Sequence, residues 1–227
     1  MSRHILAVLA VFFLVSCGPP PPPITYSPTT GHLDFSNHPN CEYRRGVDRL
    51  RRLEFEAALE CLGPIAARGD RDAQYYVGMM LLRGQGIDKN PEEAIYWLGL
   101  AAKDGDSSAQ FELGQIYREG AYVKRDNNQA LRWYQKSAKQ NHSVAQYDLF
   151  EMHYFGQGTP KDVATAMDWL HRSAEDGFSV AQHRLGIFYR NGENVDKDRA
   201  KAARLFQNAA NQNYEPARED LQALQAE

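Results

Sequence analysis

Apolar, polar and glycine positions recur along this chain with a fixed step of 36 residues from residue 71 onward. Four alanine–glutamine pairs, three tryptophans and four loop glycines set the register. They are Ala73-Gln74, Ala109-Gln110, Ala145-Gln146 and Ala181-Gln182; Trp97, Trp133 and Trp169, with Leu205 in the fourth place; and Gly84, Gly120, Gly156 and Gly192. A period of this length is typical of a solenoid, so we expect residues 71–214 to form four stacked units.

Each unit has the pattern of two helices. In the first unit, apolar residues follow a spacing of three to four residues over residues 73–83 and again over residues 91–103. Gly84 follows the first segment, where a left-handed conformation can end a helix. Asn90 is placed to cap the second segment, and Pro91 suits its first turn. The sequence therefore predicts an all-α array of helical hairpins.

Three units carry a glycine in the middle of their first helix, where glycine costs about 1 kcal/mol relative to alanine. We expect a small alanine of the second helix to approach each one closely. The glycines are Gly78, Gly114 and Gly186, and the alanines are Ala94, Ala130 and Ala202. Phe150 takes the glycine's place in the third unit, so either that unit is locally repacked or the ring turns into a pocket.

A shorter helical hairpin precedes the repeats, and a polar helix follows them. Residues 55–69 align with the second helix of a unit, and residues 41–52 supply a first helix with a shorter connection. We therefore divide the folded part into a hairpin at residues 40–70, four repeats at residues 71–214 and a capping helix at residues 215–227.

The 36-residue units resemble Sel-one-like repeats, a branch of the tetratricopeptide-like superfamily. The resemblance rests on the run Ala109-Gln110-Phe111-Glu112-Leu113-Gly114-Gln115-Ile116-Tyr117 and on Ala94-Ile95-Tyr96-Trp97 with Ala101-Ala102. It implies a right-handed α-solenoid of helix-turn-helix repeats, with a tetratricopeptide-like hairpin at residues 40–70. It also implies a protein-binding scaffold that assembles envelope machines, exports polysaccharide, supports a flagellar motor or contacts a host.

An enzyme is the alternative that the same resemblance leaves open. Some cysteine-rich relatives are linked to the binding and hydrolysis of β-lactams or cell wall. Those relatives carry a regular cysteine pair in each repeat, which this sequence lacks. The resemblance therefore favours a scaffold over an enzyme.

The first 17 residues have the pattern of a bacterial lipoprotein signal. An apolar run of eleven residues, Ile5 to Val15, leads into Leu14-Val15-Ser16-Cys17, which resembles a lipobox. The run is too short to span a bilayer as a mature helix, but it suits a signal peptide at residues 1–16. The resemblance implies cleavage before Cys17, lipid on its sulfur, and, from Gly18, sorting to the outer membrane. An ordinary secretory signal with an incidental cysteine is the alternative.

Residues 17–39 are predicted to form a proline-rich tether. Five consecutive prolines at residues 19–23 favour a stiff polyproline II spacer, at about 3.1 Å per residue. A proline-rich ligand for an SH3-like domain is the other interpretation of this run. Together with the lipobox, the tether predicts a lipid-anchored protein of the bacterial envelope, facing the periplasm or the cell surface.

Charge and candidate chemistry narrow the function further. The chain of 227 residues has a formal net charge of −3, and its basic run at Arg44-Arg45 and Arg51-Arg52 is broken by acids, so nucleic acid is not an expected partner. No histidine is spaced from another histidine or a cysteine pair as metal ligands are. We find no nucleophile with a nearby base. We therefore expect no enzyme activity and no cofactor, and the sequence does not indicate an oligomeric state.

Cys41 and Cys61 are predicted to form a disulfide. The envelope is oxidising, and lipid on Cys17 leaves an even pair. If the first hairpin turns near Arg52, Cys41 lies eleven residues before the turn and Cys61 nine after it. That mismatch is about 3 Å along a helix, which a disulfide tolerates. A reduced, packed pair of thiols is the alternative.

The predicted partner surface is the concave side of the array, which the first helices line in tetratricopeptide-like stacks. Aligned at Gly78, the repeats place unlike residues at three inner positions. The candidate binding residues are Tyr76, Met79, Glu112, Gln115, Arg118, Asp148, Glu151, Tyr154, Arg184 and Arg190. Variation at positions that merely face solvent gives the same pattern, so the sequence does not separate a binding face from a solvated one.

Overall fold

The computed structural model describes residues 23–38 and 41–226 of the chain. The predicted signal peptide at residues 1–16, Cys17 and the run of prolines up to residue 22 lie outside the described residues. The elements are β1 (Thr25–Tyr26), β2 (Leu33–Asp34), α1 (Tyr43–Arg51), α2 (Phe55–Ala67), α3 (Arg71–Arg83), α4 (Pro91–Lys103), α5 (Ser107–Glu119), α6 (Asn127–Ala138), α7 (Ser143–Phe155), α8 (Val163–Glu175), α9 (Ser179–Asn191), α10 (Arg199–Asn211) and α11 (Glu215–Ala226). Over these ranges, no helix has both the length and the hydropathy to cross a membrane.

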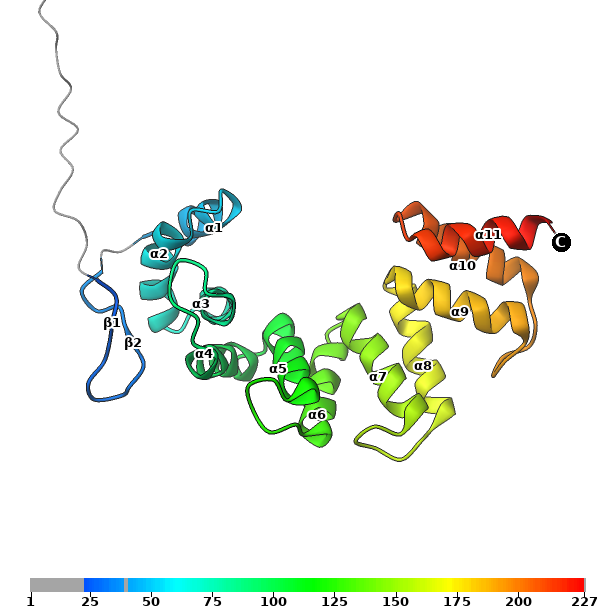
Figure 1. The fold of residues 1–227 in the computed structure, drawn as a ribbon, viewed down its shortest axis with the longest axis horizontal. Coiled ribbons are helices and arrows are strands. Elements are labelled where there is room, and N and C mark those ends of the chain that lie inside the picture. Colours follow the sequence, from blue (N-terminus) through cyan, green and yellow to red (C-terminus); the bar gives the residue numbers. More distant parts are fainter. Residues whose placement is uncertain (1–22, 39–40, 227) are drawn as a thin grey trace, which may run out of the picture.

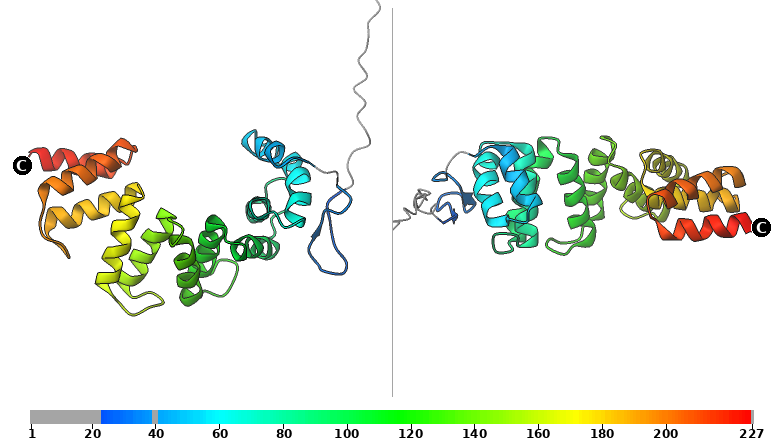
Figure 2. Two further views of the ribbon diagram at one scale, coloured as in Figure 1. Left: turned by 180° about the vertical axis from the view of Figure 1, so that it is seen from behind. Right: turned by 90° about the horizontal axis from the view of Figure 1, so that it is seen from above.

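The helices pair into hairpins that stack side by side along an open arc (Figure 1). Helices α3, α5 and α7 line the inner side of the arc, and α4, α6 and α8 lie outside them (Figures 1 and 2). Helix α9 is the first helix of the fourth repeat, and we call the surface of these four first helices the inner face. The prediction of an all-α array of paired helices is confirmed.

Local capping signals set the helix boundaries. The side chain of Asn90 accepts a hydrogen bond from the backbone N–H of Glu93 at 3.1 Å, as predicted for the cap of α4. Gly84 has a φ of 68° and ends α3, again as predicted. Asp126 caps α6 at the equivalent place in the next repeat. A left-handed glycine after the first helix and an Asn or Asp cap on the second recur in all four repeats, so each hairpin turns in the same way.

The glycines inside the first helices allow close packing, but the residue they face differs from the expectation. A Cβ on Gly78 would lie 2.8 Å from Cγ of Leu98, and one on Gly114 would lie 2.5 Å from the ring of Tyr134. The contact is therefore with the larger residue one helical turn beyond Ala94 or Ala130. The glycine leaves room for a bulky side chain, and this fills the interior better than an alanine would.

Phe150 fits the third repeat because its ring is buried between helices. Its side chain is 1% exposed and belongs to one apolar cluster with Leu170 of α8 and Phe188 of α9. Its ring centroid lies 5.3 Å from that of Tyr154 and 6.2 Å from that of Phe188. The ring thus adds aromatic contacts between the third and fourth repeats.

The repeated glutamine links each unit to the one before it. The side-chain amide of Gln110 donates to the carbonyl of Ala102 at 2.9 Å, and that of Gln182 donates to the carbonyl of Ala174 at 3.1 Å. Gln74 and Gln146 make the same bond to Ala66 and Ala138. Each of these carbonyls also accepts a backbone N–H from the turn after its helix, as that of Ala102 does from Gly105, so the glutamine adds a second hydrogen bond at the helix C-terminus.

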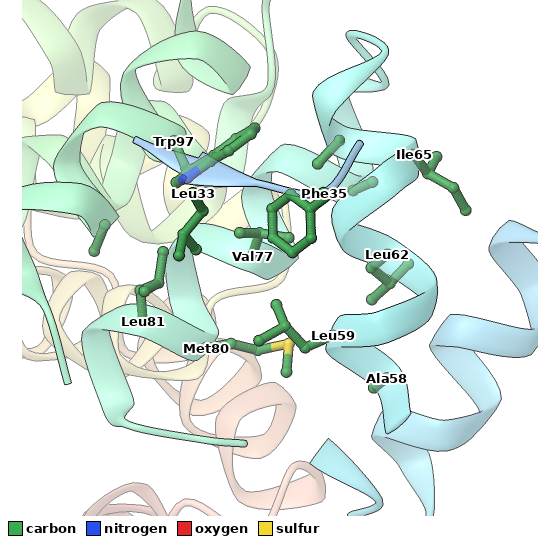
Figure 3. Packing of buried hydrophobic residues seen from close by; sticks show 13 residues of the cluster. Leu33, Phe35, Ala58, Leu59, Leu62, Ile65, Val77, Met80, Leu81 and Trp97 are labelled. Carbon is green, nitrogen blue, oxygen red and sulfur yellow. The ribbon is translucent and has the colours of Figure 1, made fainter. Parts of the chain in front are cut away.

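Residues 24–38 fold onto the first units, whereas the sequence predicted a tether through residue 39. Strands β1 and β2 pair antiparallel, with Tyr26 opposite Leu33. Leu33 is 6% exposed and Phe35 is 3% exposed, and both pack into the core formed by α2, α3 and α4 (Figure 3). These apolar side chains gain more by burial than an extended spacer would allow.

Candidate interaction surface

The predicted binding residues lie on the first helices and differ in exposure. Met79 is 6% exposed and Asp148 is 9% exposed, so both are buried. The other eight candidate residues are half-buried. A half-buried position can contact a partner, but it can also hold neighbouring repeats together, and their contacts distinguish the two roles.

Three candidate residues form one charged cluster between the second and third repeats. Arg118 donates to Asp148 at 2.5 Å and to Glu151 at 2.7 Å. Burial raises the pKa of Asp148 from 3.8 to about 6, against the lowering effect of Arg118. Burial also acts to lower the pKa of Arg118, but the hydrogen bond to Glu151 and the two acidic charges outweigh it and raise this pKa. The cluster therefore joins repeats, and its members are not free to receive a partner's charges.

A second cluster joins the fourth repeat to the capping helix. Arg190 donates to Asp220 at 2.7 Å, and Nε2 of His183 lies 2.9 Å from the same carboxylate. Burial of Asp220 acts to raise its pKa, but the hydrogen bonds from Arg190 and His183 lower it below its usual value. Asp220 was not among the residues predicted from the sequence, although Ala217 in the same helix continues the 36-residue register. Helix α11 therefore holds the place of a first helix in a fifth unit.

The same register leaves two charges without a partner. Arg118 and Asp148 are 30 residues apart, as are Arg190 and Asp220. The equivalent pairs in the other repeats are Leu82 with Glu112 and Tyr154 with Arg184. Within the described part of the chain, neither Glu112 nor Arg184 forms an ion pair. The inner face thus carries one unpaired carboxylate and one unpaired guanidinium, two repeats apart.

An apolar pocket of about 270 Å³ lies at the start of the inner face. Its lining includes Leu53, Phe55, Tyr75, Tyr76, Met79 and Arg83. Leu53 is 70% exposed and has a φ of 61°, in the left-handed region that bulky residues rarely adopt. Tyr75 lies close enough to Glu112 for that carboxylate to help raise its pKa to about 12, although burial is the larger cause. Glu112 does not line the pocket, but it acts electrostatically on Tyr75, which does.

A buried carboxylate on the outer side holds the N-terminal segment. Glu93 is 4% exposed and accepts from the backbone N–H of Leu33 at 2.9 Å and from the indole of Trp97 at 2.8 Å. Its other oxygen lies 2.7 Å from Nδ1 of His32, whose ring stacks on Tyr96 with centroids 3.4 Å apart. The other repeats have Gln129, Thr165 and Lys201 at this position. That departure from the pattern is the signal by which the sequence could have revealed the contact.

Cys41 and Cys61 form a disulfide in the structure, with their Cα atoms 5.0 Å apart. It ties the residues before α1 to the middle of α2. Across residues 23–38 and 41–226, no group of three histidine, cysteine, aspartate or glutamate side chains is arranged to hold a metal ion.

The Sel1 repeat family model matches residues 71–106, 107–142, 143–178 and 179–214, which together cover the four predicted units. A Sel1 repeat protein from Oxalobacter formigenes is similar at 31% identity and a TM-score of 0.71, over 79% of this chain and 74% of that one. The structure of c5321, a protective antigen of uropathogenic Escherichia coli strains, has 25% identity and a TM-score of 0.71, over 79% of this chain and 40% of that one. The chain thus spans less than half of the antigen's length.

An immunity protein, Pa5087 of Pseudomonas aeruginosa, shares the fold at 17% identity and a TM-score of 0.52, over 79% of this chain and 70% of that one. The comparison with curated proteins gives no match.

Proposed function

The chain belongs to the Sel1 repeat family, and we propose that it is a lipid-anchored scaffold that binds a protein partner in the bacterial envelope through its inner face. A helical repeat scaffold exposes a large curved surface, which suits protein binding more than chemistry. One observation carries the choice of face. The inner face combines an apolar pocket with the unpaired charges of Glu112 and Arg184, whereas the equivalent charges in the neighbouring repeats are paired.

Two features support the envelope location. The Cys41–Cys61 disulfide is of a kind that persists in oxidising compartments. The similar Escherichia coli protein is described as a protective antigen, which fits exposure at the cell surface. The lipobox ending at Cys17 supplies the anchor in this proposal, and the segment after it is held on the first repeats through Glu93.

Site-specific photo-cross-linking in intact cells tests the face. A photoreactive amino acid at Gln115 on the inner face is compared with one at Arg132, an exposed residue of the outer helix α6. We expect a discrete cross-linked protein from the Gln115 position alone. Adducts from Arg132 alone would place the surface on the outer side, and no adducts from either would contradict a scaffold role.

Metabolic labelling with an alkyne fatty acid tests the anchor. The wild-type chain should incorporate the label and partition with membranes. Cys17→Ser should lose both properties, while Cys61→Ser should keep the label. An unlabelled wild-type chain, with mass spectrometry showing an unmodified Cys17, would overturn the lipoprotein part of the proposal.

A further inference from the structure

We propose that the inner face accepts an extended peptide segment of the partner that carries an apolar side chain, then a basic residue, and then an acidic residue. This inference rests on the proposed protein-binding function and specifies the chemistry of the partner. The apolar side chain enters the pocket beside Tyr76 and Met79, the basic residue meets Glu112, and the acidic residue meets Arg184.

Glu112 offers the inner face's unpaired carboxylate. It is half-buried on α5, and burial raises its pKa; the charge of Arg83 opposes that rise and the charge of Glu119 adds to it. Its equivalents Asp148 and Asp220 each receive a hydrogen bond from an arginine of the preceding repeat. Glu112 instead faces the position of Leu82, which has no charge to offer. A partly desolvated carboxylate without an ion pair favours a cation from another molecule.

Arg184 offers the inner face's unpaired guanidinium. It is half-buried on α9, and its Nε is buried without a hydrogen-bond partner within the described part of the chain. Its guanidinium lies 5.2 Å from the ring centroid of Phe188, so an aromatic face positions it. The residue at the partner position is Tyr154, whose hydroxyl donates to Glu193 at 3.0 Å. The guanidinium group of Arg184 is therefore available to a carboxylate of a partner.

The repeat geometry sets the spacing of the partner's charges. Successive first helices are separated by a second helix, since α5 packs on α6 and α6 packs on α7. Packed helices lie about 10 Å apart, so each repeat advances the inner face by about 10–20 Å, and Glu112 and Arg184 lie about 20–40 Å apart. An extended chain rises about 3.3 Å per residue, which places the acidic residue about six to twelve residues from the basic one. The pocket is one repeat before Glu112, so the apolar residue lies about three to six residues from the basic one, on its other side.

Fluorescence anisotropy with three labelled peptides tests this arrangement on the mature chain. The matched peptide carries leucine, lysine and aspartate at the expected spacing in a serine–glycine background. The second exchanges the lysine and the aspartate, and the third replaces both with glutamine. At low salt we expect the matched peptide to bind about tenfold more tightly than the exchanged one, which corresponds to roughly 1.4 kcal/mol.

Variants locate the effect. Glu112→Gln and Arg184→Gln should each lower the affinity for the matched peptide to about that for the neutral peptide. The outer-face controls Glu175→Gln and Arg132→Gln should leave the affinity unchanged. The double reversal Glu112→Lys with Arg184→Glu should reverse the preference between the matched and exchanged peptides. Equal binding of all three peptides, or no binding of the matched one, would overturn the inference. Inner-face cross-links in cells alongside either of those results would leave the proposed scaffold function standing.

Discussion

Replacing Arg118 with methionine should destabilise the array, and the loss should depend on pH. Methionine keeps most of the aliphatic volume of Arg118 but removes its hydrogen bonds to Asp148 and Glu151. The Asp148 side chain is 13% exposed and that of Glu151 is 28% exposed. The first carboxylate would therefore be left buried with the Tyr134 hydroxyl as its remaining hydrogen-bond donor, while the second could still be hydrated.

The magnitude follows from the burial and the pKa of Asp148. Removing one member of a buried pair costs about 3–5 kcal/mol, and because the Arg118 side chain is 26% exposed we expect about 2–3 kcal/mol near pH 8. The pKa of Asp148 is raised to about 6, so its favourable contribution to folding is complete below its unfolded pKa and is lost as the pH rises through 6. Removal of Arg118 raises that pKa further and enlarges the loss at high pH. Near pH 5 the carboxyl is mostly protonated, and the loss should fall to about 1 kcal/mol.

Urea denaturation followed by circular dichroism near pH 5 and near pH 8 measures the difference. Arg190→Met is the matched control, because Arg190 holds the equivalent place and its partner Asp220 has a lowered pKa and a side chain that is 27% exposed. His183 would still contact that carboxylate. The control should lose about 0.5–1 kcal/mol near pH 8. An Arg118→Met loss that does not grow with pH, or that is smaller than the control's, would refute this reasoning.

Three further predictions concern the contacts that build the array. Cys61→Ser should lower the free energy of unfolding by roughly 2–4 kcal/mol, and reductant should lower the melting temperature of the wild type but not of this variant; equal melting temperatures would contradict the disulfide's contribution. Glu93→Gln should weaken the bonds to His32 and Leu33 and speed proteolytic cleavage within residues 24–38, and unchanged cleavage would show that apolar packing alone holds the segment. Phe150→Ala should cost about 3–5 kcal/mol in denaturation, so a cost below 1 kcal/mol would mean that the site collapses around the smaller side chain.

The helical array could be predicted from the sequence because its signals are local and repeated. The cap at Asn90 and the left-handed Gly84 each act within a few residues, and both were confirmed. Because the pattern recurs every 36 residues, the helices predicted for one repeat could be predicted for all four. The glycine at position 114 was also predicted to permit a close approach. Its contact with Tyr134 instead of Ala130 depends on the rotation of one helix against another, which a repeat pattern does not encode.

Tertiary structure alone decided which candidate binding residues are occupied with internal contacts. Arg118 and Asp148 are 30 residues apart, and nothing in their local sequence separates this bonded pair from the unpaired Glu112 or Arg184. The burial of Leu33 against the first repeats could not be predicted either, because its backbone N–H donates to Glu93, which lies 60 residues later in the chain. Helix formation depends on neighbours along the chain, whereas charge pairing depends on how each repeat is rotated and stacked on the next, and only the packed array sets that geometry.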